Sequence, residues 1–83
     1  MRFYLYILRS TSSGRFYVGH TEDVARRLAE HNQGRASSTR NRGPWEVIHT
    51  EEFATRSEAS RRERAIKKMK SHAWMEQLAR ASR

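Results

Sequence analysis

Residues 3–19 read FYLYILRSTSSGRFYVG, and this stretch decides the fold. Aromatic and branched residues fill 3–9 and 15–19, and a turn rich in serine and glycine separates them. Two such runs on either side of a turn are typical of a β-hairpin. Because side chains alternate along a strand, Tyr4 and Tyr6 are expected on the same face of the sheet.

A helix is predicted over residues 22–33. Thr21 is suited to cap its first turn, and the acidic residues at 22 and 23 suit the positive end of the helix dipole. Gly34 fits the left-handed position that commonly follows a helix. The apolar stripe of this helix consists of Val24, Ala25, Leu28 and Ala29.

The second half of the chain continues as a loop, a strand and a helix. Residues 35–44 are basic and turn-prone, whereas residues 45–53 predict a third strand. Thr55 and Glu58 match a capping box, which predicts a helix over 56–70. The apolar residues expected to face the core from this helix are Ala59, Ile66 and Met69.

Ser71 is suited to cap a last short helix that carries Trp74, Met75 and Leu78. The resulting order is β-β-α-β-α-α. This order predicts an α+β fold, in which helices flank a three-stranded antiparallel β-sheet. A chain of 83 residues has room for one core, so residues 1–83 are expected to form a single domain.

The composition is strongly basic. The chain has 17 Lys and Arg against 9 Asp and Glu, a formal net charge of +8. This charge favours a polyanionic partner, bound with an affinity that falls as salt rises. Most of the cations are arginine, whose planar fork grips phosphate with two hydrogen bonds. Nucleic acid is therefore the expected partner, and no long apolar face flanked by lysines points to a membrane.

Cysteine does not occur in the chain, which excludes disulfides, thiol nucleophiles and zinc knuckles. The apolar run at residues 3–8 is too short for a signal peptide or a membrane span. A cytoplasmic location is the resulting expectation.

Two groups of residues could carry chemistry. Arg27 and His31 are four residues apart and so lie on one helical face. An arginine that clamps phosphate beside an imidazole that takes a proton suits phosphoryl transfer, although on spacing alone an exposed basic face is the simpler explanation of the pair. Glu63 falls within the apolar stripe of the second helix, where an unpaired carboxylate is costly. A salt bridge to Arg62, Arg64 or Lys67, or a hard cation such as magnesium, would satisfy it.

The tyrosines of the hairpin, Tyr4, Tyr6 and Tyr17, are explained most simply as packing residues with wet hydroxyls. A tyrosine that acts as a base at neutral pH needs its pKa, ordinarily about 10, to fall. A nearby arginine, an imidazole or a divalent cation would lower it.

The ordered set Tyr4-Leu5-Tyr6, Tyr17-Val18-Gly19, Arg27, His31 and Glu63 resembles the pattern of the GIY-YIG nucleases. The resemblance covers residues 3–78 and is greatest to the small, stand-alone, single-domain bacterial branch. Residues 38–45 and 63–71 also resemble that branch, and Tyr4 stands where the first motif has its glycine.

The resemblance implies a metal-dependent endonuclease with specific roles for five residues. Tyr6 would be the general base that activates water, and Tyr17 would hydrogen-bond the nucleophile or the phosphate, although either tyrosine could be the base. Arg27 would stabilise charge on the phosphoryl oxygens, and His31 would take or relay a proton. Glu63 would hold one magnesium or manganese ion beside the leaving oxygen.

Other expectations concern the substrate. Gly19 would permit close backbone packing or an unusual turn. Their charge, and not the motif, suggests that Arg40, Arg42 and His20 contact the nucleic-acid backbone together with Arg27. DNA is favoured over RNA, structure selectivity over sequence specificity, and DNA repair is suggested by analogy. The alternatives are a non-catalytic or partner-dependent nucleic-acid-binding module and a basic ribosome-associated protein. Self-association and a protein partner are both left open.

Overall fold

The computed structural model of the chain describes residues 1–35, 42–69 and 72–81. It contains, in order, β1 Phe3–Ser10, β2 Phe16–Thr21, α1 Val24–Asn32, β3 Trp45–Phe53, α2 Arg56–Met69 and α3 His72–Ala81. The predicted α+β class and the order β-β-α-β-α-α are therefore confirmed. No helix among these residues is long and apolar enough to cross a membrane.

The three strands form one antiparallel sheet in the order β2-β1-β3, so β2 and β3 are its two edges. The hairpin between β1 and β2 turns at Gly14, whose φ of 75° suits glycine. Its register places Tyr6 opposite Gly19. The pairing with β3 shifts between Ile7 and Leu8, so a bulge interrupts that ladder.

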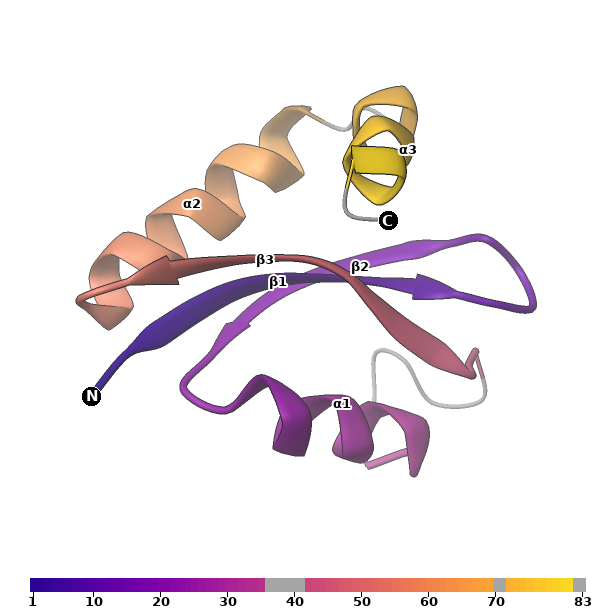
Figure 1. Cartoon of the computed structure of the whole chain (residues 1–83), viewed down its shortest axis with the longest axis horizontal. Coiled ribbons are helices and arrows are strands. Elements are labelled where there is room, and N and C mark those ends of the chain that lie inside the picture. The colour runs from indigo at the N-terminus through magenta and orange to yellow at the C-terminus, as the bar shows by residue number, and fades with distance from the viewer. Residues whose placement is uncertain (36–41, 70–71, 82–83) are drawn as a thin grey trace.

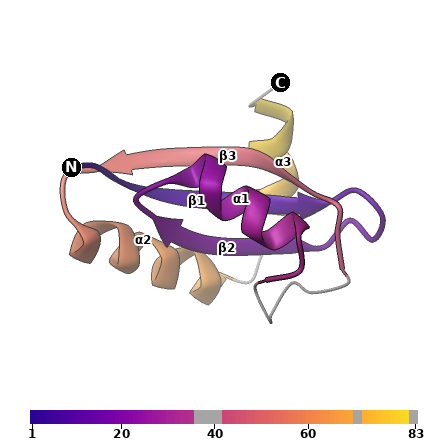
Figure 2. The same ribbon diagram turned by 90° about the horizontal axis from the view of Figure 1, so that it is seen from below.

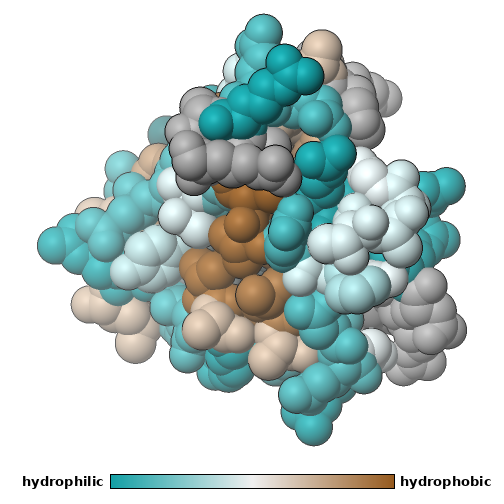
Figure 3. Space-filling model, turned by 45° about the vertical axis from the view of Figure 1, so that its right-hand side comes forward, coloured by the Kyte–Doolittle hydropathy of each residue, from teal (hydrophilic) through white to brown (hydrophobic). Residues whose placement is uncertain are grey.

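Helices cover both faces of the sheet (Figure 1), with α1 on one side and α2 and α3 on the other. The cluster beneath α2 and α3 consists of Leu5, Ile7, Val18, Ile48 and Ile66. Apolar residues of α3 pack against it while remaining partly exposed. Figure 3 shows a strip of apolar surface between hydrophilic flanks.

The second cluster, on the α1 face, is built around Tyr6, Leu8 and Trp45. Figure 2 looks onto this face, with α1 lying across the strands and α2 behind them, on the β2 side. Because side chains alternate along β1, Tyr6 and Leu8 reach this cluster, whereas Leu5 and Ile7 reach the other. The polar ring of His31 is also buried on α1, at 2% exposure.

The start of α1 differs from the prediction. Asp23, and not Thr21, is the N-cap: its side chain accepts the Arg26 N–H at 3.0 Å. Thr21 is still part of β2, and its hydroxyl accepts the Asp23 N–H at 3.2 Å, which turns the chain toward the helix. Ala25 and Ala29 are exposed, because a helix lying on a sheet buries only a narrow stripe, here along Val24, Leu28 and His31.

The predicted cap of α2 is confirmed, since Thr55 Oγ1 accepts the Glu58 N–H at 3.2 Å. Ala59 and Ile66 are fully buried as predicted. Met69 is instead 45% exposed, because it is the last residue of α2 and lies at the margin of the core. Ser71 lies outside the described residues.

Candidate active site

Three aromatic rings meet on the α1 face of the sheet. Tyr6 Oη lies 3.0 Å from His31 Nε2, and both side chains are 2% exposed. The Tyr17 ring is 4.8 Å from the His31 ring and 6.2 Å from the Tyr6 ring, centroid to centroid. The hairpin supplies the two tyrosines and the last turn of α1 supplies the histidine.

Gly19 leaves the space in which the Tyr6 hydroxyl lies. A Cβ atom at this position would be 2.6 Å from Tyr6 Oη and 2.8 Å from Tyr6 Cζ. Any larger residue would therefore displace the tyrosine. The predicted close packing at Gly19 is confirmed, and it lets a side chain of the central strand reach toward the β2 edge.

Burial sets the protonation of both partners. Burial raises the pKa of Tyr6 to about 12, and the hydrogen bond from Arg27 offsets this only in part. Burial, followed by the positive charge of Arg27, lowers the pKa of His31. At neutral pH the pair is therefore a phenol and a neutral imidazole. In the tautomer that carries its ring proton on Nδ1, Nε2 accepts the hydrogen bond from the Tyr6 hydroxyl. The groups within the described residues therefore raise the pKa of Tyr6, whereas a tyrosine base requires a lowered one.

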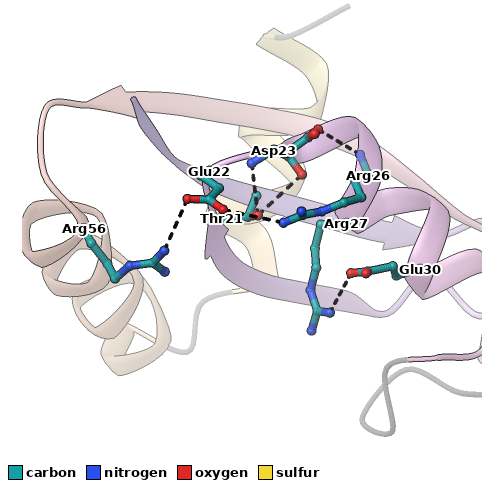
Figure 4. A network of polar contacts seen from close by, with 7 residues as sticks. All are labelled: Thr21, Glu22, Asp23, Arg26, Arg27, Glu30 and Arg56. Atoms are coloured by element: carbon teal, nitrogen blue, oxygen red, sulfur yellow. Dashed lines mark hydrogen bonds and ion pairs between the residues drawn. The ribbon is translucent and has the colours of Figure 1, made fainter. Parts of the chain in front are cut away.

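Arg27 leaves α1 on the side of this pair, and Glu30 orients it. Its Nη1 donates to Glu30 Oε1 at 3.0 Å, a contact seen from close by in Figure 4. That hydrogen bond raises the pKa of Arg27 and lowers the pKa of Glu30. Figure 4 also shows Arg56 of α2 reaching Glu22, 3.7 Å away, at the turn before α1. Helices on the two faces are thus joined around the end of the sheet.

Glu63 lies on α2, on the other face of the sheet, with 17% of its side chain exposed. Its Oε1 is 2.7 Å from His20 Nδ1, and its Oε2 is 2.7 Å from Lys67 Nζ. Burial raises the pKa of Glu63, but hydrogen bonds from Lys67 and His20 outweigh this effect and hold the pKa below its ordinary value. The carboxylate is therefore ionised and held between two donors.

The Tyr6–His31 pair and the Glu63 carboxylate lie on opposite faces of the sheet, near the β2 edge. Along β2, Tyr17 and Gly19 face α1 whereas His20 faces α2, because side chains alternate. The charge of Glu63 still reaches Tyr6, since it contributes to raising the pKa of that tyrosine. The β2 edge is thus the place where a substrate could touch the aromatic pair and the carboxylate together.

The donor set allows one kind of metal site. Among the described residues, no group of three or more His, Asp or Glu side chains could hold a metal ion. A single ionised carboxylate fits magnesium, which keeps several waters and takes oxygen ligands from substrate phosphates. Glu63 would hold such an ion once Lys67, whose side chain is 53% exposed, swings aside. His20 would remain behind the carboxylate and orient it.

The residues predicted to contact the nucleic-acid backbone do not lie together in the structure. Arg42 is exposed beside Arg15 and two serines, in a shallow pocket of about 380 Å³ at the hairpin turn. Arg40 lies outside the described residues. His20 binds Glu63, although it was expected to meet the nucleic-acid backbone. Sequence reasoning missed this pair because 43 residues separate its members and no local spacing links them.

Fold and site together define a small α+β domain with Tyr, His and Arg on one side of an open sheet edge and Glu on the other. A model of the GIY-YIG catalytic domain matches residues 2–76, and the chain belongs to the GIY-YIG family. Membership makes it a nuclease-type nucleic-acid phosphodiesterase domain. Nucleases of this family generally depend on a divalent metal.

Relatives with this domain occur in diverse organisms. A UPF0213 protein of Listeria monocytogenes is 49% identical over 67 residues, which span 80% of this chain and 74% of that protein. A UPF0213 protein of Halobacterium salinarum is 52% identical over 59 residues, which span 70% of this chain and 77% of that protein. The solution NMR structure of a UPF0213 protein from Bacillus halodurans has a TM-score of 0.56 at 39% identity, covering 98% of this chain and 85% of that one. These names state no activity, metal or substrate.

Proposed function

We propose that the chain is a divalent-metal-dependent endonuclease that cuts DNA in preference to RNA. The observation that carries this proposal is the buried hydrogen bond of 3.0 Å between Tyr6 Oη and His31 Nε2. A phenol that donates to a neutral imidazole in a dry site can pass on a proton. If Tyr6 had only a packing role, phenylalanine would suit the position equally well, because it has no hydroxyl that needs a hydrogen-bond partner.

The proton path follows from this geometry. A water at the β2 edge gives a proton to Tyr6 Oη while the phenol proton moves to His31 Nε2. The water oxygen forms a bond to phosphorus, and the bond from phosphorus to the leaving oxygen breaks. The leaving oxygen departs with the bonding electrons and takes a proton from solvent water. The high pKa of Tyr6 suits this relay, because the phenol stays protonated until the imidazole takes its proton.

Two charged groups complete the site. Arg27, oriented by Glu30, offers N–H donors to phosphoryl oxygens, where negative charge grows during the reaction. Glu63 would hold magnesium or manganese, which when bound supplies a Lewis acid at the leaving oxygen. The Tyr17 ring lies beside that of His31 at an interplanar angle of 58°, and its hydroxyl can hydrogen-bond the water or the phosphate.

The small size of the domain argues for recognition of shape. One such module meets few bases, so we expect selectivity for branched or otherwise distorted DNA rather than for a sequence. The proposal includes a cytoplasmic location and a role in DNA repair, both carried over from the sequence.

A second function, nucleic-acid binding without independent turnover, also has support. Both Glu63 oxygens are hydrogen-bonded to protein groups, and the pKa of Tyr6 is about 12. A protein partner that rearranges these groups would then be needed for cleavage. This module would bind DNA in a salt-sensitive manner and give no products in magnesium.

A cleavage panel distinguishes the two functions. Purified protein is incubated with labelled single-stranded, duplex and branched DNA and RNA, in magnesium or in EDTA, beside Glu63→Ala. Magnesium-dependent products that disappear in the variant support the nuclease and rank the substrates. Binding without products under every condition contradicts it and favours the binding module.

A further inference from the structure

The outer face of α2 carries a cluster of cations that the proposed reaction does not use. Arg61, Arg64, Lys67 and Lys68 line a shallow, open groove of about 660 Å³, together with Ala65. All five residues are exposed. We name this surface the α2 groove.

Other basic residues of the same helix are engaged within the protein. Arg56 pairs with Glu22 at 3.7 Å, and Arg62 grips Glu51 with two hydrogen bonds of 2.8 and 3.2 Å. By contrast, the side chains of Arg61, Arg64 and Lys68 have no ion pair or hydrogen bond within residues 1–35, 42–69 and 72–81. Within the described residues, three of the four cations of the α2 groove are therefore uncompensated, whereas Lys67 pairs with Glu63.

This uncompensated charge has a cost for the helix. Arg61, Arg64 and Lys68 follow one another at spacings of three and four residues, and like charges at such spacings destabilise a helix. The helix dipole favours cations only in the last turn, so it accounts for Lys67 and Lys68 but not for the two arginines. An external polyanion would offset the repulsion.

The groove is continuous with the candidate active site. Lys67 belongs to it and also donates to Glu63 Oε2 at 2.7 Å. Arg61 and Lys68 are seven residues apart, so the cations extend over roughly 10.5 Å of helix. That length matches about three base pairs of duplex, at about 3.4 Å of axis per phosphate on one strand. The small side chain of Ala65 lets a backbone approach closely.

We infer that the α2 groove binds the phosphodiester backbone of the nucleic acid on one side of the cut bond. Arg61, Arg64 and Lys68 hold successive phosphates, and Lys67 moves from Glu63 to a phosphate as the substrate arrives. The inference rests on the proposed function only in taking nucleic acid as the substrate. The groove would position the substrate and would carry no sequence specificity.

The test measures binding in EDTA, where cleavage does not interfere. Wild-type protein is compared with the triple variant Arg61→Gln, Arg64→Gln, Lys68→Gln, on a labelled duplex and on a single strand over a range of salt. Glutamine is a good helix former, so α2 is expected to persist. The control variant, Arg2→Gln, Arg26→Gln, Arg80→Gln, removes the same charge from exposed positions elsewhere.

The groove variant should make the negative slope of log K against log salt shallower, reducing its magnitude by about 2.7 on duplex and by about 2.1 on single strand. The control should keep the wild-type slope. Equal slopes for the two triple variants would overturn the inference. So would a groove variant that binds nucleic acid normally but loses binding to vesicles containing phosphatidylserine, because the surface would then serve a membrane.

Failure of the inference and failure of the proposed function give different results. If the groove variant cleaves DNA in magnesium and binds it with unchanged affinity, the nuclease function is supported and the role of the α2 groove in binding is excluded. If the groove variant shows a weaker salt dependence but the wild-type protein does not cleave DNA, binding by the α2 groove is supported and the nuclease function is contradicted.

Discussion

Two histidine–glutamate pairs lie near opposite edges of the sheet and differ in what holds the carboxylate. Near the β3 edge, Glu51 meets His49 at 2.8 Å and the planar fork of Arg62. Near the β2 edge, Glu63 meets His20 at 2.7 Å and the flexible, half-exposed Lys67. An arginine fork fixes a carboxylate, whereas lysine is a mobile point charge. Glu51 is therefore built to stay in place, and Glu63 to exchange one partner.

The two faces of the sheet differ in a similar way. The aromatic pair on the α1 face is almost fully buried and so is set when the chain folds. The carboxylate on the α2 side sits in a partly wet environment, where a cation or a phosphate can enter. In the proposed reaction, proton transfer would therefore depend on packing, whereas charge stabilisation would depend on the bound metal and substrate.

The largest expected effect is that of Glu63→Gln. Loss of the metal-binding carboxylate should lower magnesium-dependent cleavage at least about a thousandfold, since a Lewis acid contributes several kcal/mol to transition-state stabilisation. Glu51→Gln is the matched control: it should lose about 1–3 kcal/mol of stability through its charged hydrogen bonds and retain cleavage. Equal loss of cleavage in both variants would remove the distinction between the pairs.

Gly19→Ala should have the next largest effect. Its Cβ would lie 2.6 Å from Tyr6 Oη, so the ring must shift, and a displacement of about 1 Å can cost about a hundredfold in rate. Gly14→Ala is the control, because its strain comes from a φ of 75° with no atom within 4 Å of the new Cβ. It should lower the melting temperature and spare the cleavage rate. Normal cleavage by the Gly19 variant would show that the position of Tyr6 is unimportant.

His20→Ala should weaken metal binding about 10- to 100-fold, because a group that orients a metal ligand sets its affinity. The rate at saturating magnesium should change little, and a magnesium titration of cleavage measures both quantities. His20→Asn retains a donor near Nδ1 and should restore part of the affinity, while His49→Ala should not alter it. A lower maximal rate with unchanged metal affinity would argue against an orienting role.

The smallest effect concerns stability and pH. The pKa of His31 is lowered in the folded state, so the unfolded chain binds more protons and stability falls as pH drops below about 6.5. His31→Gln keeps an acceptor for Tyr6 and should flatten this dependence, by at most about 1.4 kcal/mol per pH unit. Denaturant unfolding from pH 7 downward measures it. The same slope in the variant and the wild type would mean that His31 does not titrate as a buried imidazole.

Much of the fold follows from local signals in the sequence. The hairpin turn, the Thr55 cap and the alternation along β1 each agree with the structure, because each depends on neighbours only. The predicted N-cap of α1 was wrong because Thr21 and Asp23 are both good capping residues. Thr21 is the last residue of β2, so Asp23 caps the helix.

The candidate site was less accessible to sequence reasoning. The motifs identify Tyr6, Tyr17, Arg27 and His31, which the structure places around one point. The partnership of His20 with Glu63 depends on how α2 docks against β2, which no spacing reveals. The raised pKa of Tyr6 depends on burial beneath α1, which likewise appears only in the folded chain.

The central claim is that Tyr6, held by His31 above Gly19, is the group that takes the proton from water. Single-turnover cleavage of branched DNA at saturating magnesium, by Tyr6→Phe and by Tyr17→Phe, tests it most directly. Loss of a general base predicts a rate about 10²- to 10⁴-fold lower for Tyr6→Phe, with a much smaller loss for Tyr17→Phe and both proteins folded. Cleavage by folded Tyr6→Phe at the wild-type rate would contradict the account.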